Sequence, residues 1–153
     1  MSHQQTFFDW QARALGGLLA WGAGSTVAGA GLARARAPIV RHIGLQAVGW
    51  GLIDLLLAIN GRRGASRQAI SASAADTHAA AARFRAILAV NALLDVGYIL
   101  GGARLARAAG DRHDRQGMGI GILLQGAFLL AYDLILLGAA ARWLRKSDSR
   151  SRA

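Results

Sequence analysis

The sequence predicts an all-α membrane protein, a bundle of four transmembrane helices, and three observations point to this fold class. First, four segments contain no Lys or Arg for 18 to 26 residues, and a helix of about 20 residues crosses roughly 30 Å of hydrocarbon. Second, 54% of the 153 residues are hydrophobic. Third, the segments show almost no polar face, whereas the helices of a soluble bundle normally do. The expected spans are residues 14–33, 42–61, 86–103 and 116–141 of a single membrane domain.

The segment before the first span is interpreted as the approach to the membrane surface. It contains Phe7, Phe8 and Trp10, and aromatic side chains are enriched at the membrane–water interface. A cleaved signal peptide would have a basic start and an apolar core of about 7 to 15 residues. Here the only early basic residue is Arg13 and the apolar run is longer, so we expect a first span that is retained.

Small residues dominate the first span. Ala20, Gly24 and Ala28 recur at every fourth position, a spacing that lets helix backbones approach closely within lipid. The next connection, residues 34–41, is short and holds the only proline, Pro38, which is typical of a helix boundary. The first two spans are therefore expected to form an antiparallel hairpin.

Two further segments are expected outside the membrane. Residues 62–85 form the longest connection, in which a helix start at Asp76 predicts that the third span extends out of the membrane. Residues 142–153 are basic and predict a disordered tail. The N-terminus, the long connection and the tail together hold 11 Lys and Arg, against 7 in the short connections. The positive-inside rule thus predicts cytoplasmic termini in a bacterial cytoplasmic membrane.

The second and fourth spans share a pattern that indicates an internal repeat. Gln46 and Asp54 are eight residues apart, and so are Gln125 and Asp133. If the repeat is real, each unit is a two-helix hairpin, and both hairpins have the same orientation in the membrane. Counting from the flanking arginines puts Asp54, Asp133 and Asn91 at one level, and puts Gln46 and Gln125 in the opposite half of the membrane.

Polar side chains inside the spans mark a candidate functional centre. An ionised carboxylate in hydrocarbon is so unfavourable that it takes up a proton, finds a cation or faces the bundle interior. No Lys or Arg lies inside the spans to neutralise Asp54, Asp95 and Asp133. Asn91, Asp95 and Tyr98 follow i, i+4, i+7 spacing and so share one helix face. The candidate binding residues are Asp54, Asp95, Asp133, Asn91, Gln46, Gln125 and Tyr98.

Two hypotheses for this centre remain open. In the first, the aspartates are protonated and hydrogen-bond across helices, each bond contributing about 0.6 to 2 kcal/mol, in a structural or complex-supporting membrane subunit that self-associates. In the second, they form the site of a proton- or cation-coupled transporter or channel for a small solute.

Other classes of chemistry have little support. The absence of Cys excludes disulfides, thiolate metal sites and iron–sulfur clusters. The four histidines are scattered over termini and connections without metal-ligand or haem spacing. We therefore expect no metal, no cofactor and no enzymatic activity. The net charge of +10 sits at the ends of apolar runs, which favours membrane lipids and other membrane proteins, and not nucleic acid, as partners.

Four motifs together give the chain a family resemblance. They are WGAGS at 21–25, GLQAVGWGLID at 44–54, NALLDVGYILGG at 91–102 and QGAFLLAYD at 125–133. The chain resembles a family of small, functionally uncharacterised bacterial membrane proteins with four predicted spans. The resemblance implies a four-helix membrane fold and brings no activity with it.

Overall fold

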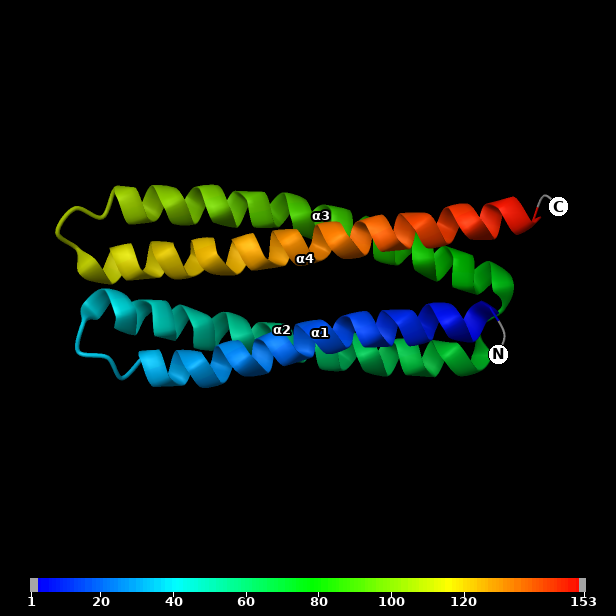
Figure 1. The fold of residues 1–153 in the computed structure, drawn as a ribbon, viewed down its shortest axis with the longest axis horizontal. Coiled ribbons are helices and arrows are strands. Elements are labelled where there is room, and N and C mark those ends of the chain that lie inside the picture. Colours follow the sequence, from blue (N-terminus) through cyan, green and yellow to red (C-terminus); the bar gives the residue numbers. More distant parts are fainter. Residues whose placement is uncertain (1–2, 152–153) are drawn as a thin grey trace.

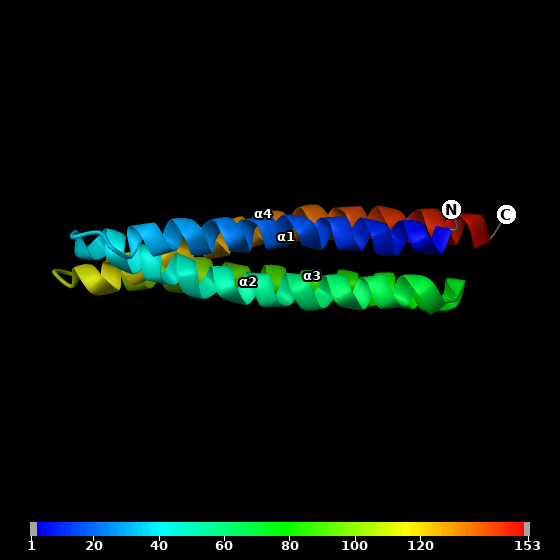
Figure 2. The ribbon, with the colours of Figure 1, turned by 90° about the horizontal axis from the view of Figure 1, so that it is seen from below.

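The computed structural model describes residues 3–151, which form four long helices and no strand. These are α1 (His3–Leu32), α2 (Pro38–Ser71), α3 (Ala74–Arg107) and α4 (His113–Ser151). Helices α1 and α2 form one antiparallel hairpin, α3 and α4 form another, and the two hairpins lie side by side (Figure 1). Seen from below, α1 and α4 share one layer and α2 and α3 the other (Figure 2).

The predicted fold class is confirmed. All four helices are long and apolar enough to cross a membrane, which indicates a membrane protein. Their residues also show the pattern expected in lipid, because large apolar side chains such as Leu56, Leu93 and Ile135 are exposed while three aspartates are buried. The arrangement as two packed hairpins agrees with the hairpin units inferred from sequence.

Local chemistry explains where each helix begins and ends. Pro38 stands in the first turn of α2, where a missing backbone N–H costs nothing. Ser73 caps α3 in a capping box with Asp76, and the Ser73 side chain and backbone that bond to this carboxylate hold the pKa of Asp76 below its usual value. Between α3 and α4, Gly110 has a φ of +55°, a conformation that favours glycine.

One expectation about the segments outside the expected spans is confirmed and one is wrong. The third helix extends beyond its span as predicted and starts at Ala74, close to Asp76. Because α2 also continues to Ser71, the connection 62–85 is helical apart from Ala72 and Ser73. The predicted disordered tail is helical over residues 142–151, and residues 152–153 lie outside the described part of the chain. Helices of 30 to 39 residues are about 45 to 58 Å long and so exceed the membrane.

The excess length lies at the end of the bundle that carries both termini (Figure 1). We call residues 3–13, 62–71, 74–85 and 142–151 the terminal extension. It is held together by a hydrophobic core in which Phe7 and Phe8 are almost fully buried, with 0% and 1% of their surface exposed. Phe7 packs on Trp143 with ring centroids 4.8 Å apart, and Trp10 packs on Phe84 at 5.9 Å.

The expected role of Phe7 and Phe8 at the membrane surface therefore needs correction. Their rings point into the bundle, because the four helices extend beyond the spans expected from the sequence and pack around a hydrophobic core there. An apolar centre with charged residues outside is the pattern of a water-soluble bundle. The terminal extension thus has the packing of a soluble protein joined to a membrane domain.

Glycines set the close packing within each hairpin. A Cβ atom at Gly22 would lie 2.8 Å from the carbonyl oxygen of Gly51, and one at Gly29 would lie 2.7 Å from that of Gly44. In the second hairpin, a Cβ atom at Gly102 would lie 2.7 Å from the carbonyl oxygen of Gly119. These helices approach so closely that no side chain fits between their backbones.

Candidate functional site

Three carboxylates meet in the middle of the bundle. Asp54 on α2, Asp95 on α3 and Asp133 on α4 have only 2%, 3% and 7% of their surface exposed. All three line one cavity of about 200 Å³, together with Asn91 and Tyr98 of α3. The structure therefore brings five of the seven candidate residues into one space between the hairpins. We call it the polar cavity.

Asp54 is held by a relay of hydrogen bonds that joins three helices. The side-chain nitrogen Nε2 of Gln125 donates to Oδ2 of Asp54 at 2.6 Å. The indole Nε1 of Trp21 in turn donates to Oε1 of Gln125 at 3.2 Å. Because Trp21 is on α1, Gln125 on α4 and Asp54 on α2, the relay links the first hairpin to the second.

The other two carboxylates differ in their partners. Asp133 accepts a hydrogen bond from the side chain of Asn91. In contrast, Oδ2 of Asp95 is buried and makes no hydrogen bond with any residue that the structure describes. Asp95 is also close enough to Asp54 and Asp133 for their charges to repel one another. An ionised form of all three groups is therefore strongly disfavoured, and the centre is suited to holding protons.

Within the part of the chain that the structure describes, no basic side chain lines the polar cavity. Its remaining wall is apolar and aromatic, and the rings of Trp50 and Tyr98 meet there edge to face, with centroids 5.0 Å apart. Among the described residues, no group of three or more His, Cys, Asp or Glu has the geometry to hold a metal ion. The three aspartates converge without forming a metal-ligand set.

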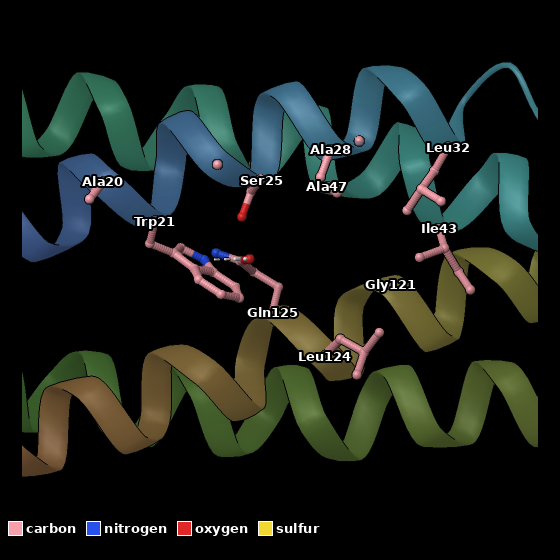
Figure 3. Close-up of a pocket in the computed structure, with 12 residues that line it drawn as sticks. Ala20, Trp21, Ser25, Ala28, Leu32, Ile43, Ala47, Gly121, Leu124 and Gln125 are labelled. Atoms are coloured by element: carbon pink, nitrogen blue, oxygen red, sulfur yellow. Dashed lines mark hydrogen bonds between the residues drawn. The ribbon is translucent and has the colours of Figure 1, made fainter.

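A second cavity lies on the other side of Gln125. It has a volume of about 330 Å³ and is lined by α1, α2 and α4. Figure 3 shows Ser25 directed into this space, with the hydrogen-bonded pair of Trp21 and Gln125 beside it. Its other walls are small or apolar, among them Gly24 and Ala28. We call it the lateral groove. Gln125 lines the groove and bonds to Asp54 in the polar cavity, so the relay separates the two spaces.

Gln46 is placed elsewhere. It packs against Gly121, where an added Cβ atom would lie 2.6 Å from the Cβ of Gln46, and it lines neither cavity. The sequence predicts Gln125 in the half of the membrane opposite Asp54, and the structure brings the two side chains into direct contact. A glutamine side chain is long enough to cross the distance between their backbone levels.

Trp21 and Tyr132 have roles that the sequence patterns did not reveal. The Tyr132 hydroxyl donates to the backbone carbonyl of Ala14 and joins α4 to α1. Trp21 also stacks on Phe128, with ring centroids 3.6 Å apart. The residue types themselves give a general signal for these roles, because an indole N–H or a phenol O–H within lipid needs a hydrogen-bond acceptor. Their partners are more than a hundred positions away along the chain, so no local spacing points to them.

Comparison with known proteins finds a match to a family profile. No curated protein and no solved structure matches the chain. A family profile matches residues 17–134, a segment that contains the whole polar cavity and the lateral groove. That match spans most of the chain, and the protein therefore belongs to the family described as "Family of unknown function (DUF6992)".

Proposed function

We propose that this protein is a proton-coupled carrier or channel of the bacterial cytoplasmic membrane, with Asp95 as the group that takes up and releases the proton. Its termini and the terminal extension lie in the cytoplasm, as the excess of Lys and Arg at that end favours. A small solute is the cargo. No enzymatic step and no nucleic-acid partner is part of the proposal.

One observation carries the proposal. The carboxylate oxygen Oδ2 of Asp95 is buried in the membrane domain without a hydrogen-bond partner among the described residues, and two further carboxylates share its cavity. If a carboxyl group only held helices together, both of its oxygen atoms would be expected to make hydrogen bonds to neighbouring side chains. An ionisable group inside the membrane is by default a functional candidate, with proton relays as a common use.

The same geometry suggests how a proton would be coupled to movement. Loss of a proton from Asp95 places a negative charge beside Asp54 and Asp133, which favours their separation or their protonation. Asp54 is tied to Gln125 and through it to Trp21. A change at Asp95 can therefore alter the relay that separates the lateral groove from the polar cavity. We propose the proton as the coupling species, because Oδ2 of Asp95 is buried without a hydrogen-bond partner among the described residues.

The test is proton movement in liposomes. We expect the purified protein, reconstituted with a trapped pH-sensitive dye, to pass protons when a potassium diffusion potential is applied. Asp95→Asn should reduce this flux to the level of protein-free liposomes while leaving thermal unfolding in detergent unchanged. The reason is that Asn preserves the size of the side chain and cannot bind the proton.

The matched control is Asp111→Asn, which removes a carboxylate from the exposed connection between α3 and α4 and should leave proton flux intact. The proposal fails if the wild-type protein moves no protons and releases none when small solutes are added. It also fails if Asp95→Asn and the wild type conduct equally.

A structural, complex-supporting subunit is the second candidate, and a separate observation favours it. The face of α1 that carries Gly24 and Gly31 is uncovered, because a Cβ atom at either glycine would meet nothing within 4 Å. Val27 between them is 75% exposed. A face of small residues is the kind of surface on which membrane helices associate. We propose that a second copy of the chain, or another membrane protein, covers this face.

Measuring the oligomeric state of the protein tests this candidate. Gly24→Leu should fold normally, since the site has room within one chain, but should convert a dimer or larger oligomer into a monomer. Light scattering of the detergent-solubilised protein measures the change. Gly49→Leu on α2 is the matched control, because Gly49 is also exposed and unobstructed. Equal oligomeric states in wild type and Gly24→Leu would argue against an α1 interface.

A further inference from the structure

We propose that a recess between α1 and α4, at the membrane boundary of the terminal extension, binds the phosphate of an anionic membrane lipid. The recess has a volume of about 230 Å³ and is lined by Trp10, Ala139, Arg142, Trp143 and Lys146. It is separate from the polar cavity and the lateral groove, and lies outside the matched family segment. The inference needs only the membrane placement of the helices and is independent of proton coupling.

No ion pair within residues 3–151 neutralises the positive charge of the recess. Arg142 and Lys146 are four residues apart and so project from the same face of α4. The ion pairs found among the described residues join His78 to Asp148 and Arg112 to Asp114, and neither involves this pair of cations. Two adjacent, exposed positive charges without a carboxylate are an arrangement that recruits an anion.

The position of the Arg142 side chain is a second reason to expect a bound anion at this recess. Its Nη1 atom lies 3.7 Å from the place that a Cβ atom would occupy at Gly138. The exposed guanidinium group therefore lies back along α4, next to Gly138. A cation at the edge of the hydrocarbon is unfavourable without a compensating charge. With the fourth span ending at residue 141, as the sequence predicts, Arg142 and Lys146 are at the height of the lipid phosphates.

Aromatic packing shapes the recess and fixes its walls. Trp10 and Trp143 both pack on the buried ring of Phe7, with centroids 5.9 Å and 4.8 Å apart. Tryptophan is enriched at the membrane–water interface, because its ring is apolar and its N–H is polar. With an apolar floor at Ala139 and cations above it, the recess suits the phosphate and upper glycerol region of a lipid better than a free phosphate ion.

Quenching of tryptophan fluorescence tests this site directly, since two of the chain's four tryptophans line it. The full chain is placed in phosphatidylcholine bilayers that contain a small share of brominated phosphatidylglycerol or of brominated phosphatidylcholine. We expect stronger quenching by the anionic lipid. Arg142→Gln/Lys146→Gln should weaken its apparent association about 30-fold, because each cation at an anionic surface contributes roughly fivefold.

The control is Arg67→Gln/Arg145→Gln, which removes the same charge from exposed positions at the same end of the bundle and should leave the quenching unchanged. Arg142→Lys should retain the preference for anionic lipid, which guards against a folding defect in the double variant. Equal losses in the two double variants, equal quenching by both lipids, or displacement of the lipid by inorganic phosphate would each overturn the proposal.

Discussion

The three aspartates of the polar cavity have the same chemistry but different surroundings. Asp54 accepts from Gln125 and Asp133 from Asn91, whereas one oxygen of Asp95 has no partner among the described residues. A hydrogen bond within a membrane contributes about 0.6 to 2 kcal/mol, so the two bonded aspartates add to the stability of the bundle. Asp95 contributes no such bond through Oδ2, and it is the group to which we assign proton exchange in the proposed carrier or channel. We therefore propose a packing role for Asp54 and Asp133 and a proton-binding role for Asp95.

Single residues also show what the sequence could and could not predict. The high cost of a charge in lipid was enough to predict that Asp54, Asp95 and Asp133 are buried. It could not predict which Asn or Gln side chain hydrogen-bonds to which Asp. Gln46 and Gln125 have the same spacing to an aspartate, yet of these two only Gln125 hydrogen-bonds to an aspartate of the polar cavity. The choice depends on how the two hairpins are rotated against each other, and local sequence does not encode that rotation.

At the scale of helices, their number and pairing were predictable from length and hydrophobicity, but their true ends were not. Residues 62–71 and 74–85 are rich in Ala and Arg, which are strong helix formers. A reading based on hydrophobicity treats such segments as connections because they are polar. Their helical propensity, the capping box at Ser73 and the aromatic core of the terminal extension carry the helices beyond the membrane.

The glycine contacts between α1 and α2 allow a matched test on a single helix. A Cβ atom at Gly51 would lie 2.5 Å from Oγ1 of Thr26 and 2.7 Å from the carbonyl oxygen of Gly22, whereas one at Gly49 would meet nothing within 4 Å. Gly51→Ala should therefore destabilise the protein by about 1 to 3 kcal/mol through overpacking. Thermal unfolding followed by circular dichroism in detergent micelles measures the effect.

Gly49→Ala is the control for this experiment. It makes the same chemical change two residues away on α2 and gains the same helix propensity, so its stability should equal or exceed that of the wild type. Equal melting temperatures for the two variants would show that the close approach of α1 and α2 is not required for stability.

The whole molecule combines two modes of stabilisation along one bundle. In the membrane domain, apolar side chains face outward and the helices are held by glycine contacts and buried hydrogen bonds. In the terminal extension, an aromatic and aliphatic core is surrounded by charged residues, and the exposed pair of His78 and Asp148 joins α3 to α4. The two parts are therefore sensitive to different substitutions, although the same four helices run through both.

Limited proteolysis can test whether these two parts unfold independently. Phe7→Ala removes a fully buried ring from the extension, a change that typically costs about 3 to 5 kcal/mol. We expect trypsin to cleave after Arg67 and Arg83 much faster in this variant, while cleavage in the connection between α3 and α4 stays at the wild-type rate. Leu100→Ala, which truncates an exposed side chain of α3 within the membrane domain, should change neither rate. Faster cleavage at both ends of the bundle in Phe7→Ala would mean that extension and membrane domain unfold as one unit. With the protein in sealed vesicles, the side from which trypsin reaches Arg67 also tests the cytoplasmic placement of the extension.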